Sequence, residues 1–467
     1  MASDRVRFGE KFAYGFGDLA SVLYWQTFMS FILYYYTDVF GIGAAAAGTM
    51  MLLTRLWDGV NDPMMGVIAD RTETRWGKFR PYLLWICVPF AVVGVLTFTS
   101  PSLSPGGKLV YAYVTFTLMM MVYTAINIPY SALLGVISSD PVERTGISSI
   151  KFIFAYTAGT FVSATLPMMT TGLGGGSEAR GWQLTFVIYG IAAIAFFLIA
   201  FSFTRERVHP IVKQRNPIGR DLVDLFSNRA WVTLLVATIL MILFVAGRMT
   251  VTWHYFKYYV GTQQLGSLTL TPTASLGAFG LVGQGAAILG VIGAPFVARR
   301  VGNRNTFLLL LGVAVTSTAA FFVCQPHQLT LMFALNIVGS GTGGPLSPLL
   351  WAMYADAADY GEWKTGRRAT GLVFSASTMS QKFGWAIGGA VAGWFLAGVG
   401  FQANTGPSAS VLQGLRLLMS LIPAALGVLC AVPMLLYKLD AKQMKTIQEE
   451  LMIRREQAEA SSSAAAG

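Results

Sequence analysis

The sequence predicts an all-α polytopic membrane protein with twelve transmembrane helices, and three observations support this. Of its 467 residues, 54% are hydrophobic and only 12% are charged, whereas about a quarter of a typical soluble domain is charged. The mean hydropathy is +0.57. Apolar stretches long enough to cross a bilayer, about 17–25 residues each, recur from one end of the chain to the other. The expected spans are roughly 10–37, 44–69, 81–100, 109–137, 147–171, 182–203, 230–260, 273–298, 305–325, 329–357, 370–399 and 412–437.

The longest polar interval between spans lies near the midpoint and divides them into two groups of six. Within this interval, Asp221 to Phe226 is a candidate for a short interfacial helix. The expected parts of the chain are a six-helix bundle over 1–204, a cytoplasmic middle loop over 205–229, a second six-helix bundle over 230–437 and a cytoplasmic tail over 438–467.

The two groups share short strings at corresponding places. A Gly-Lys-Phe-Arg string at Gly77 follows span two, and a Gly-Asn-Arg-Asn string at Gly302 follows span eight. Lys151 in span five and Lys382 in span eleven each begin a Lys-Phe-x-x-Ala string. Repeated halves are typical of membrane transporters.

Positive charge alternates between the loops and predicts the orientation. The net charge of +11 would indicate a nucleic-acid partner in a soluble chain. Here the basic residues lie between apolar spans, so we expect a lipid bilayer and no nucleic acid as partner, with both termini in the cytoplasm and the protein in the plasma membrane. The loops placed inside hold Arg71 to Arg80, Arg144, Arg205 to Arg229, Arg299 to Arg304, Lys364 to Arg368 and the tail from Lys438.

Two carboxylates inside span two are the most informative residues. Asp58 and Asp62 are four residues apart, so on a helix they share one face, with Asn61 beside them. Charged groups inside a membrane normally face a bundle interior or a water-filled cavity, where they bind ions, protons or substrate. Pro63 removes one helix hydrogen bond next to them. Such a cluster of hard oxygens suits a small cation or a proton. The alternative is a soluble core helix in which Arg55 neutralises Asp58.

Other spans also carry polar or aromatic groups, and each has a second interpretation. Lys151 either enters the bundle or extends to the cytoplasmic surface. Arg248 lies mid-span, where it either contacts a ligand or forms a structural ion pair. Lys257 lies among tyrosines and is read as an interfacial anchor. The remaining candidates are Asp18 and Trp25 in span one, Tyr123, Thr124 and Asn127 in span four, and Thr378 and Lys382 in span eleven.

An enzyme is not indicated. The histidines His209, His254 and His327 are scattered, no nucleophile is paired with one of them, and the three cysteines lie far apart without metal spacing. We therefore expect no catalytic residue and no cofactor other than a coupling ion. A sugar sensor usually has an added soluble domain, and the tail here is short.

Several strings resemble the glycoside–pentoside–hexuronide:cation symporters of the major facilitator superfamily. They are spread over both halves, so the resemblance covers essentially the whole chain and implies the major facilitator fold. The matching strings are Y-Y-Y-T-D-V-F-G from Tyr34, W-D-G-V-N-D-P-M-M-G from Trp57, R-W-G-K-F-R-P from Arg75, N-I-P-Y from Asn127 and A-D-Y-G-E-W-K from Ala358.

The resemblance implies roles for individual residues. Asp58 and Asp62, with Asn61 and Thr124, correspond to the coupling-cation site, which would hold Na⁺ on the two carboxylates or accept H⁺. Asn127 stands where melibiose-type members have an aspartate that holds sugar hydroxyls, and Ser131 stands where one of them has a tryptophan, so a galactoside is disfavoured. The positions that line the sugar pocket in the family are Asp18, Trp25, Tyr123, Asn127, Lys151, Thr378 and Lys382.

The charges inside the spans favour an anionic sugar. Asp18, Asp58 and Asp62 stand against Lys151, Lys382 and Arg248. A bound cation would offset part of the acid cluster and free basic groups to receive a carboxylate. We therefore expect symport of a glucuronide or other hexuronide, with a pentoside next. The alternatives are a proton-coupled exporter of the same fold and a non-transporting membrane sugar sensor.

The resemblance further implies alternating access, in which the two halves rock about a binding site near the bilayer midplane. We expect a monomer, and we expect cytoplasmic ion pairs to hold the outward-facing state. The residues expected to form them are Arg75, Lys78, Arg80, Glu362 and Arg368.

Overall fold

The computed structural model describes residues 6–138, 141–207, 226–265, 268–365, 370–437 and parts of 439–453. Asp221 and Arg368 lie outside the described residues, as do the side chains of Arg144 and Thr378. Within the described part, the helices form twelve consecutive columns, one for each expected span. The first six are α1 (Phe8–Ser30) with α2 (Ile32–Tyr34) and η1 (Tyr35–Phe40), α3 (Ala44–Arg71), α4 (Arg80–Thr97), α5 (Pro105–Ile137), α6 (Pro141–Gly172) and α7 (Glu178–Phe203).

The second group follows the same plan. A short antiparallel hairpin of β1 (Gln263–Leu265) and β2 (Leu268–Leu270) joins its first two columns. The columns are α9 (Arg229–His254) with η2 (Tyr255–Val260), α10 (Pro272–Val301), α11 (Asn303–Ala320) with η3 (Phe321–Val323), α12 (Leu329–Gly343) with α13 (Leu346–Thr365), α14 (Thr370–Gly398), and α15 (Ala409–Met419) with α16 (Leu421–Leu436). The expected all-helical membrane fold is therefore confirmed.

Several helices begin at serine or asparagine residues whose side chains cap the first turn. Side-chain oxygens of Ser104, Asn228 and Ser408 accept hydrogen bonds from backbone N–H groups three residues further on, at 3.2–3.3 Å. These bonds satisfy donors that have no partner within the first helical turn. At the other end of the first column, Gly41 has a φ of 84° and ends η1 in the left-handed conformation that glycine tolerates best.

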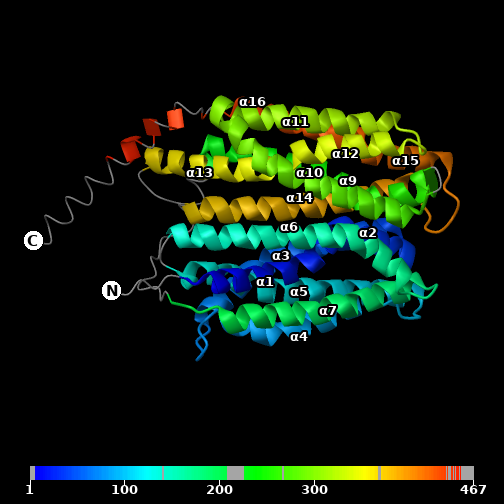
Figure 1. Cartoon of the computed structure of the whole chain (residues 1–467), viewed down its shortest axis with the longest axis horizontal. Helices are drawn as coiled ribbons and strands as arrows, with labels where there is room; N and C mark the ends of the chain where they lie inside the picture. The colour runs from blue at the N-terminus through cyan, green and yellow to red at the C-terminus, as the bar shows by residue number, and fades with distance from the viewer. Residues whose placement is uncertain are drawn as a thin grey trace, which may run out of the picture.

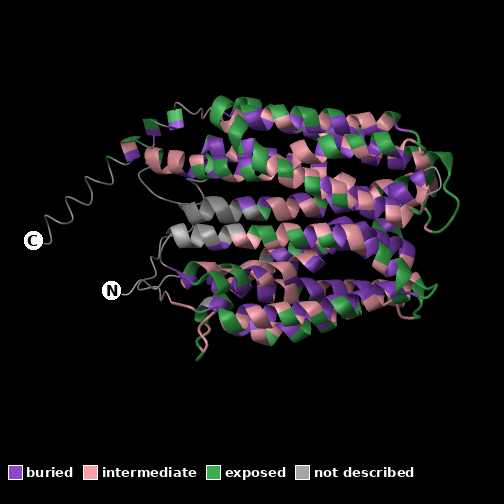
Figure 2. Cartoon of the chain, viewed as in Figure 1, coloured by how far each residue is buried: buried purple, intermediate pink, exposed green. Residues whose placement is uncertain are grey.

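The outer faces of the helices are apolar, as a lipid environment requires. Leu289 and Phe296 on α10 and Leu436 on α16 are 71%, 66% and 67% exposed. Figure 2 shows exposed positions alternating with buried ones along the outer helices. In the described part of the chain, eight helical segments are long and apolar enough to cross a membrane by themselves. The protein is therefore a multi-pass membrane protein.

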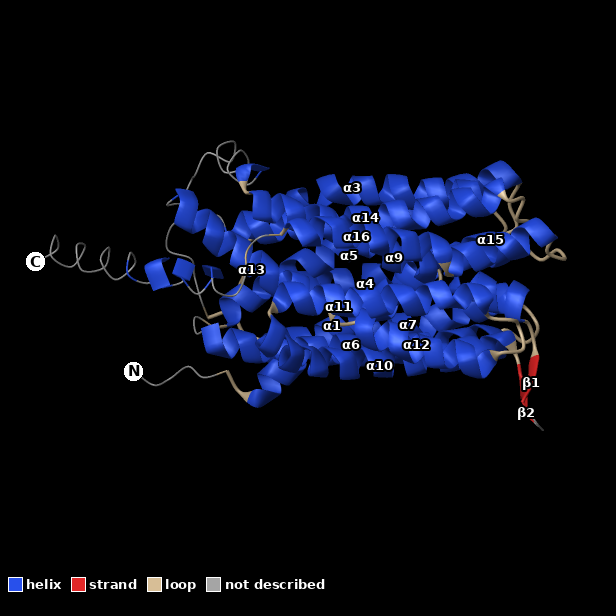
Figure 3. Cartoon of the chain, turned by 90° about the horizontal axis from the view of Figure 1, so that it is seen from above, coloured by secondary structure: helices blue, strands red, loops and turns tan. Residues whose placement is uncertain are grey.

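In Figure 1 the helices before residue 208 form the lower layer and those after residue 225 form the upper layer. The layers meet where α3 packs against α14 and α6 packs against α10. The exact bounds of the two bundles and of the loop between them stay predictions. We call the side where α1 begins and α16 ends the terminal side, and the side that carries the β1–β2 hairpin the hairpin side (Figure 3).

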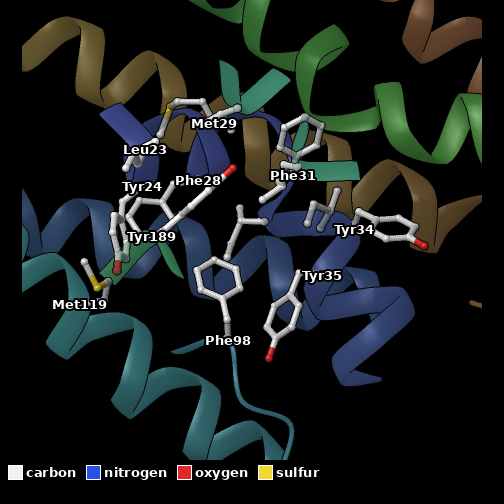
Figure 4. Close-up of a cluster of buried hydrophobic side chains, with 14 of the residues drawn as sticks. Leu23, Tyr24, Phe28, Met29, Phe31, Tyr34, Tyr35, Phe98, Met119 and Tyr189 are labelled. Atoms are coloured by element: carbon white, nitrogen blue, oxygen red, sulfur yellow. The ribbon is translucent and has the colours of Figure 1, made fainter. Parts of the chain in front are cut away.

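An aromatic core holds the first bundle together. Phe28 of α1 stacks on Phe98, just after α4, with ring centroids 6.2 Å apart (Figure 4). Phe98 also stacks on Phe186 of α7 at 3.6 Å. Tyr24 of α1 contacts Phe90 of α4 at 4.5 Å. Large rings of this kind bury much apolar surface and pack with defined geometry, so these contacts hold α1 and α7 against α4 and the residue that follows it.

Glycines allow the two layers to approach closely between α3 and α14. A Cβ atom on Gly393 would lie 2.6 Å from the carbonyl oxygen of Ala44 and 3.0 Å from Cα of Gly48. We expect Gly393→Val to destabilise this arrangement by about 1–3 kcal/mol, as overpacking usually does, and to lower the melting temperature of the purified protein in detergent. Gly398→Val on the same helix is the control, because nothing lies within 4 Å of the Cβ position there. Equal melting temperatures for the two variants would contradict the prediction.

Candidate functional site

Asp58 on α3 forms a buried ion pair with Arg55 one turn earlier. The Asp58 Oδ2 and Arg55 Nη1 atoms are 3.5 Å apart, and the two side chains are only 4% and 5% exposed. The guanidinium carbon of Arg55 lies 4.6 Å from the ring centroid of Trp25 on α1. The second carboxylate oxygen, Oδ1, is buried without a hydrogen-bond partner. Asp58 therefore has a balanced charge and one oxygen without a hydrogen-bond partner.

Asp62, one turn further along α3, is held by both halves of the protein. Thr124 on α5 donates a hydrogen bond to Asp62 Oδ1 at 2.9 Å. Lys382 on α14 forms an ion pair with Asp62 Oδ2. Because α5 belongs to the first half and α14 to the second, this carboxylate joins the two halves.

The two acids on α3 are thus neutralised separately, each by its own basic side chain, rather than by one shared ion. Asn61, between them in sequence, is partly buried, and its Nδ2 has no hydrogen-bond partner. Arg55 and Asp58 do form the buried ion pair that the alternative interpretation expects in a soluble core helix. Here the pair lies within a membrane helix. The assignment of Asp58, Asn61, Asp62 and Thr124 to a cation site stays a prediction.

A second polar cluster lies between α1, α5 and α6. Lys151 Nζ is 3.6 Å from Asp18 Oδ1, and it lies 5.5 Å from the ring centroid of Tyr130. Lys151 thus contacts a carboxylate on a neighbouring helix. This contact explains the position of Lys151 without an extension of its side chain to the membrane surface.

Aromatic rings and an amide complete the first half of the site. Trp25 and Tyr123 stack with ring centroids 5.4 Å apart and an interplanar angle of 27°. Asn127 donates from Nδ2 to the backbone carbonyl of Tyr123, one turn earlier, at 3.1 Å. Flat ring faces of this kind suit the C–H faces of a sugar, and they also pack well in a core, so the substrate roles of these residues stay predictions.

A cavity of about 410 Å³ lies beside these clusters, mainly against the second half. Of the described residues that the sequence assigns to substrate binding, only Arg248 lines it, and none of the ion-paired acids Asp18, Asp58 and Asp62 does. Trp385 of α14 lines this cavity and also a smaller void beside Arg55. Polar residues that line the cavity and that sequence reasoning did not single out include Gln26, Ser163, Gln284, Asn336, Ser340 and Gln381. For the amides among them, a polar side chain in the middle of an apolar span was the signal that could have found them.

A third polar cluster, which we call the Asp38 cluster, closes the hairpin side. The Asp38 side chain on η1 is fully buried. Its Oδ1 accepts from Lys257 Nζ of η2 at 2.8 Å and from the Tyr258 hydroxyl. Its Oδ2 lies 3.3 Å from Nε2 of His254 on α9. Asn404, in the loop before α15, donates from Nδ2 to the Asp38 carbonyl at 2.7 Å.

The Asp38 cluster connects the two halves at their ends, because Asp38 comes from the first half, whereas His254, Lys257, Tyr258 and Asn404 come from the second. Tyr34 stacks on Trp253 beside it, with ring centroids 4.1 Å apart. Lys257, read from sequence as an interfacial anchor, forms an ion pair with a buried carboxylate instead. The structure is therefore closed on the hairpin side.

Three of the expected gating residues at the terminal side, Arg75, Lys78 and Arg80, contact other residues of the first half in the described part of the chain. Arg80 donates from Nη2 to the Phe201 carbonyl at 2.6 Å. Arg75 lies over the Trp76 ring at 4.4 Å. Lys78 Nζ is 4.0 Å from Glu73. Arg368 lies outside the described residues, so its pairing with Glu362 or with the first half stays a prediction.

Glu206 organises this corner of the protein. Its carboxylate accepts hydrogen bonds from the backbone N–H groups of Lys78, Phe79 and Arg80 at 2.8–2.9 Å, where α4 begins. A carboxylate at a helix N-terminus satisfies unpaired donors and interacts favourably with the helix dipole. The basic loop is thereby fixed to the chain that follows α7.

Comparison with known proteins agrees with this architecture. The profile of the family described as "MFS/sugar transport protein" matches residues 13–441. The chain is similar to an isoprimeverose transporter of Lactiplantibacillus pentosus, with 36% identity covering 95% of this chain and 91% of the relative. It is also similar to a putative glycoside/cation symporter of Escherichia coli, with 34% identity over 96% and 95% of the two chains.

Other matches extend this picture. A glucuronide carrier protein homolog of Escherichia coli is 31% identical over 94% of each chain. Among solved structures, that of a D-xylose–proton symporter covers 93% of this chain and 99% of its own, with a TM-score of 0.64 and 13% identity, which shows a shared fold. The family profile and the length over which the relatives align place the chain without ambiguity: it belongs to the MFS/sugar transport protein family.

Proposed function

We propose that this protein is a secondary active symporter that couples a glycoside to Na⁺ or H⁺. The observation that carries the proposal is Asp62, a carboxylate on a spanning helix. It accepts a hydrogen bond from Thr124 of one half and forms an ion pair with Lys382 of the other. The names of its relatives, an isoprimeverose transporter and a putative glycoside/cation symporter, point to the same class of substrate.

The geometry supports a coupling mechanism based on competition at Asp62. A small cation that binds the free Oδ1 of Asp58 and a carboxylate oxygen of Asp62 competes with Lys382 for Asp62. Lys382 is then released towards the glycoside, next to Gln381 and Trp385, which line the cavity. Cation binding thereby prepares the sugar site. By linkage, bound sugar must favour cation binding by the same factor.

We propose that the terminal side faces the cytoplasm. Basic residues gather in the loops there, whereas the hairpin side holds few, among them Lys108 and Arg180 in the first turns of α5 and α7. The conformation described here, closed by the Asp38 cluster on the hairpin side, is then closed towards the exterior. In alternating access, the halves separate at the Asp38 cluster to admit substrate from outside.

The polar residues around the site support an anionic glycoside as the substrate. Asn127, rather than a carboxylate, stands beside Tyr123, and four basic side chains lie within the spans near the site: Arg55, Lys151, Arg248 and Lys382. We propose a hexuronide, such as a glucuronide, with a neutral pentoside as the second candidate.

Uptake into liposomes tests the proposed function. We expect the purified protein to accumulate a labelled glycoside above its outside concentration when an inward Na⁺ or H⁺ gradient is imposed, and to lose this when the gradient is collapsed. Glu73→Gln is the control, because that carboxylate is 83% exposed on the terminal-side loop, and it should accumulate glycoside as the wild type does. Accumulation independent of both gradients, or transport only outwards, would contradict symport.

A further inference from the structure

Among the described basic residues that line the cavity, Arg248 is the one without an acidic partner. Among the described residues of the spanning helices around the cavity, each acid has its own base: Asp18 with Lys151, Asp58 with Arg55 and Asp62 with Lys382. In that part of the chain, Arg248 has no carboxylate within ion-pair distance, and its Nη2 is buried without a hydrogen-bond partner. The unbalanced charge of the site therefore lies on α9.

The contacts of Arg248 position its charge but do not neutralise it. Nη1 donates to the Thr318 hydroxyl on α11 at 3.3 Å. The guanidinium carbon lies 4.3 Å from the ring centroid of Phe321. A hydroxyl and an aromatic face offer a cation much less than a carboxylate does, and a charge inside a protein without a counter-charge is costly. An anion that arrives from outside would offset that cost.

The cavity beside Arg248 has the size of a small-molecule site, and its mostly apolar wall carries a few polar groups. Its volume of about 410 Å³ falls in the range common for small-molecule sites. Asn336 and Ser340 of α12 line the same wall, and Asn336 is oriented by donating to the Phe279 carbonyl at 2.8 Å. Across the cavity, Gln26 of α1 donates to Ser163 of α6 at 3.2 Å. Hydroxyl and amide groups thus face the cavity from both halves.

We propose that Arg248 is the anchor of an anion subsite that binds the carboxylate of a uronide-type glycoside. The planar guanidinium can donate two parallel hydrogen bonds to a carboxylate. The sugar hydroxyls are then left to the amides and hydroxyls of the cavity wall. This proposal rests on the proposed function, and it places the recognition of the anionic group on the second half, away from the cation site on α3.

An anion subsite and a purely structural role predict different effects of losing Arg248 on the binding of charged and neutral glycosides. If the arginine serves only to pack against Phe321 and Thr318, its loss weakens the binding of charged and neutral glycosides alike. If it binds the carboxylate, its loss affects the charged glycoside selectively. A matched pair of ligands therefore separates the two roles.

The experiment measures binding to the purified protein in detergent by isothermal titration, with p-nitrophenyl β-D-glucuronide and p-nitrophenyl β-D-glucoside. We expect the wild type to bind the glucuronide about tenfold more tightly or better, as hydrogen bonds to charged groups allow. Arg248→Gln should remove this preference, and Arg248→Lys should keep part of it. Arg416→Gln is the control, because Arg416 of the same half bonds to the Phe322 carbonyl and does not line the cavity.

The proposal is overturned if the wild type binds the two ligands equally or binds neither, or if Arg248→Gln keeps the wild-type preference. Loss of affinity for both ligands by the same factor in Arg248→Gln overturns it in favour of packing. These outcomes do not depend on gradient-driven uptake, because the binding is measured at equilibrium with the same ion concentrations for both glycosides. Failure of gradient-driven uptake would remove the proposed function and would leave the ratio of the two affinities as a separate result.

Discussion

In the Asp62→Asn variant, we expect gradient-driven accumulation of glycoside to be abolished. The substitution removes the carboxylate for which Lys382 and the coupling cation compete, and it leaves Lys382 inside the membrane without its counter-charge. In this account the carboxylate is the group at which cation binding is linked to the release of Lys382, so without it we expect no coupling. Uptake into liposomes under an imposed Na⁺ or H⁺ gradient measures it.

A second variant separates coupling from stability. Asp62→Asn combined with Lys382→Met removes both charges and so avoids an unpaired lysine. We expect the double variant to recover the melting temperature of the wild type but not its accumulation of glycoside. Accumulation by Asp62→Asn at the wild-type level, driven by the same gradient, would show that this carboxylate takes no part in coupling.

The second large effect is expected at the Asp38 cluster. Asp38 accepts charge-assisted hydrogen bonds from the second half while fully buried. We expect Asp38→Asn to weaken the closure of the hairpin side by several kcal/mol, as loss of one partner of a buried pair does. The population should then shift by more than tenfold towards a conformation open on that side, and the transport rate should fall.

Labelling of a single cysteine measures this shift. Ser30 of α1 is 7% exposed and lines the cavity, so Ser30→Cys reports access from the hairpin side when a membrane-impermeant maleimide is added there. The native cysteines Cys87, Cys324 and Cys430 are buried and should give little background. Arg180→Gln, at an exposed position in the first turn of α7, is the control. Equal labelling rates with and without Asp38→Asn would contradict the assigned role of the cluster.

The fold follows from the sequence because membrane thickness sets helix length. Each expected span overlaps one helical column of the described chain. The bounds differ where helices continue past the apolar region: α5 begins at Pro105 rather than near 109, and the tenth column continues to Thr365 rather than ending near 357. Polar residues at these ends lower the hydropathy without ending the helix, so an apolar window underestimates its length.

The candidate site was only partly predictable. Sequence spacing places Asp58 and Asp62 on one helix face, and the resemblance links them to Thr124, which the structure places in contact with Asp62. Periodicity describes the faces of one helix but not which helix lies opposite. For this reason the pairing of Asp62 with Lys382, 320 residues apart in sequence, needed the structure.

The Asp38 cluster shows the same limit more clearly. Asp38 was part of a recognised string, and His254 was one of three scattered histidines. Their side chains meet because η1 and α9 end at the same side of the membrane, with Thr37 and His254 separated by 217 residues in sequence. A folded structure is required to show that these residues from the two halves form one polar contact.

Reciprocal binding tests the central claim most directly. The affinity of the purified protein for a glycoside is measured with and without saturating cation, and the affinity for the cation is measured with and without saturating glycoside. We predict that each ligand tightens the binding of the other by the same factor, and that Asp62→Asn brings this factor to one. If neither Na⁺ nor a change of pH altered the glycoside affinity of the wild type, that result would contradict the account.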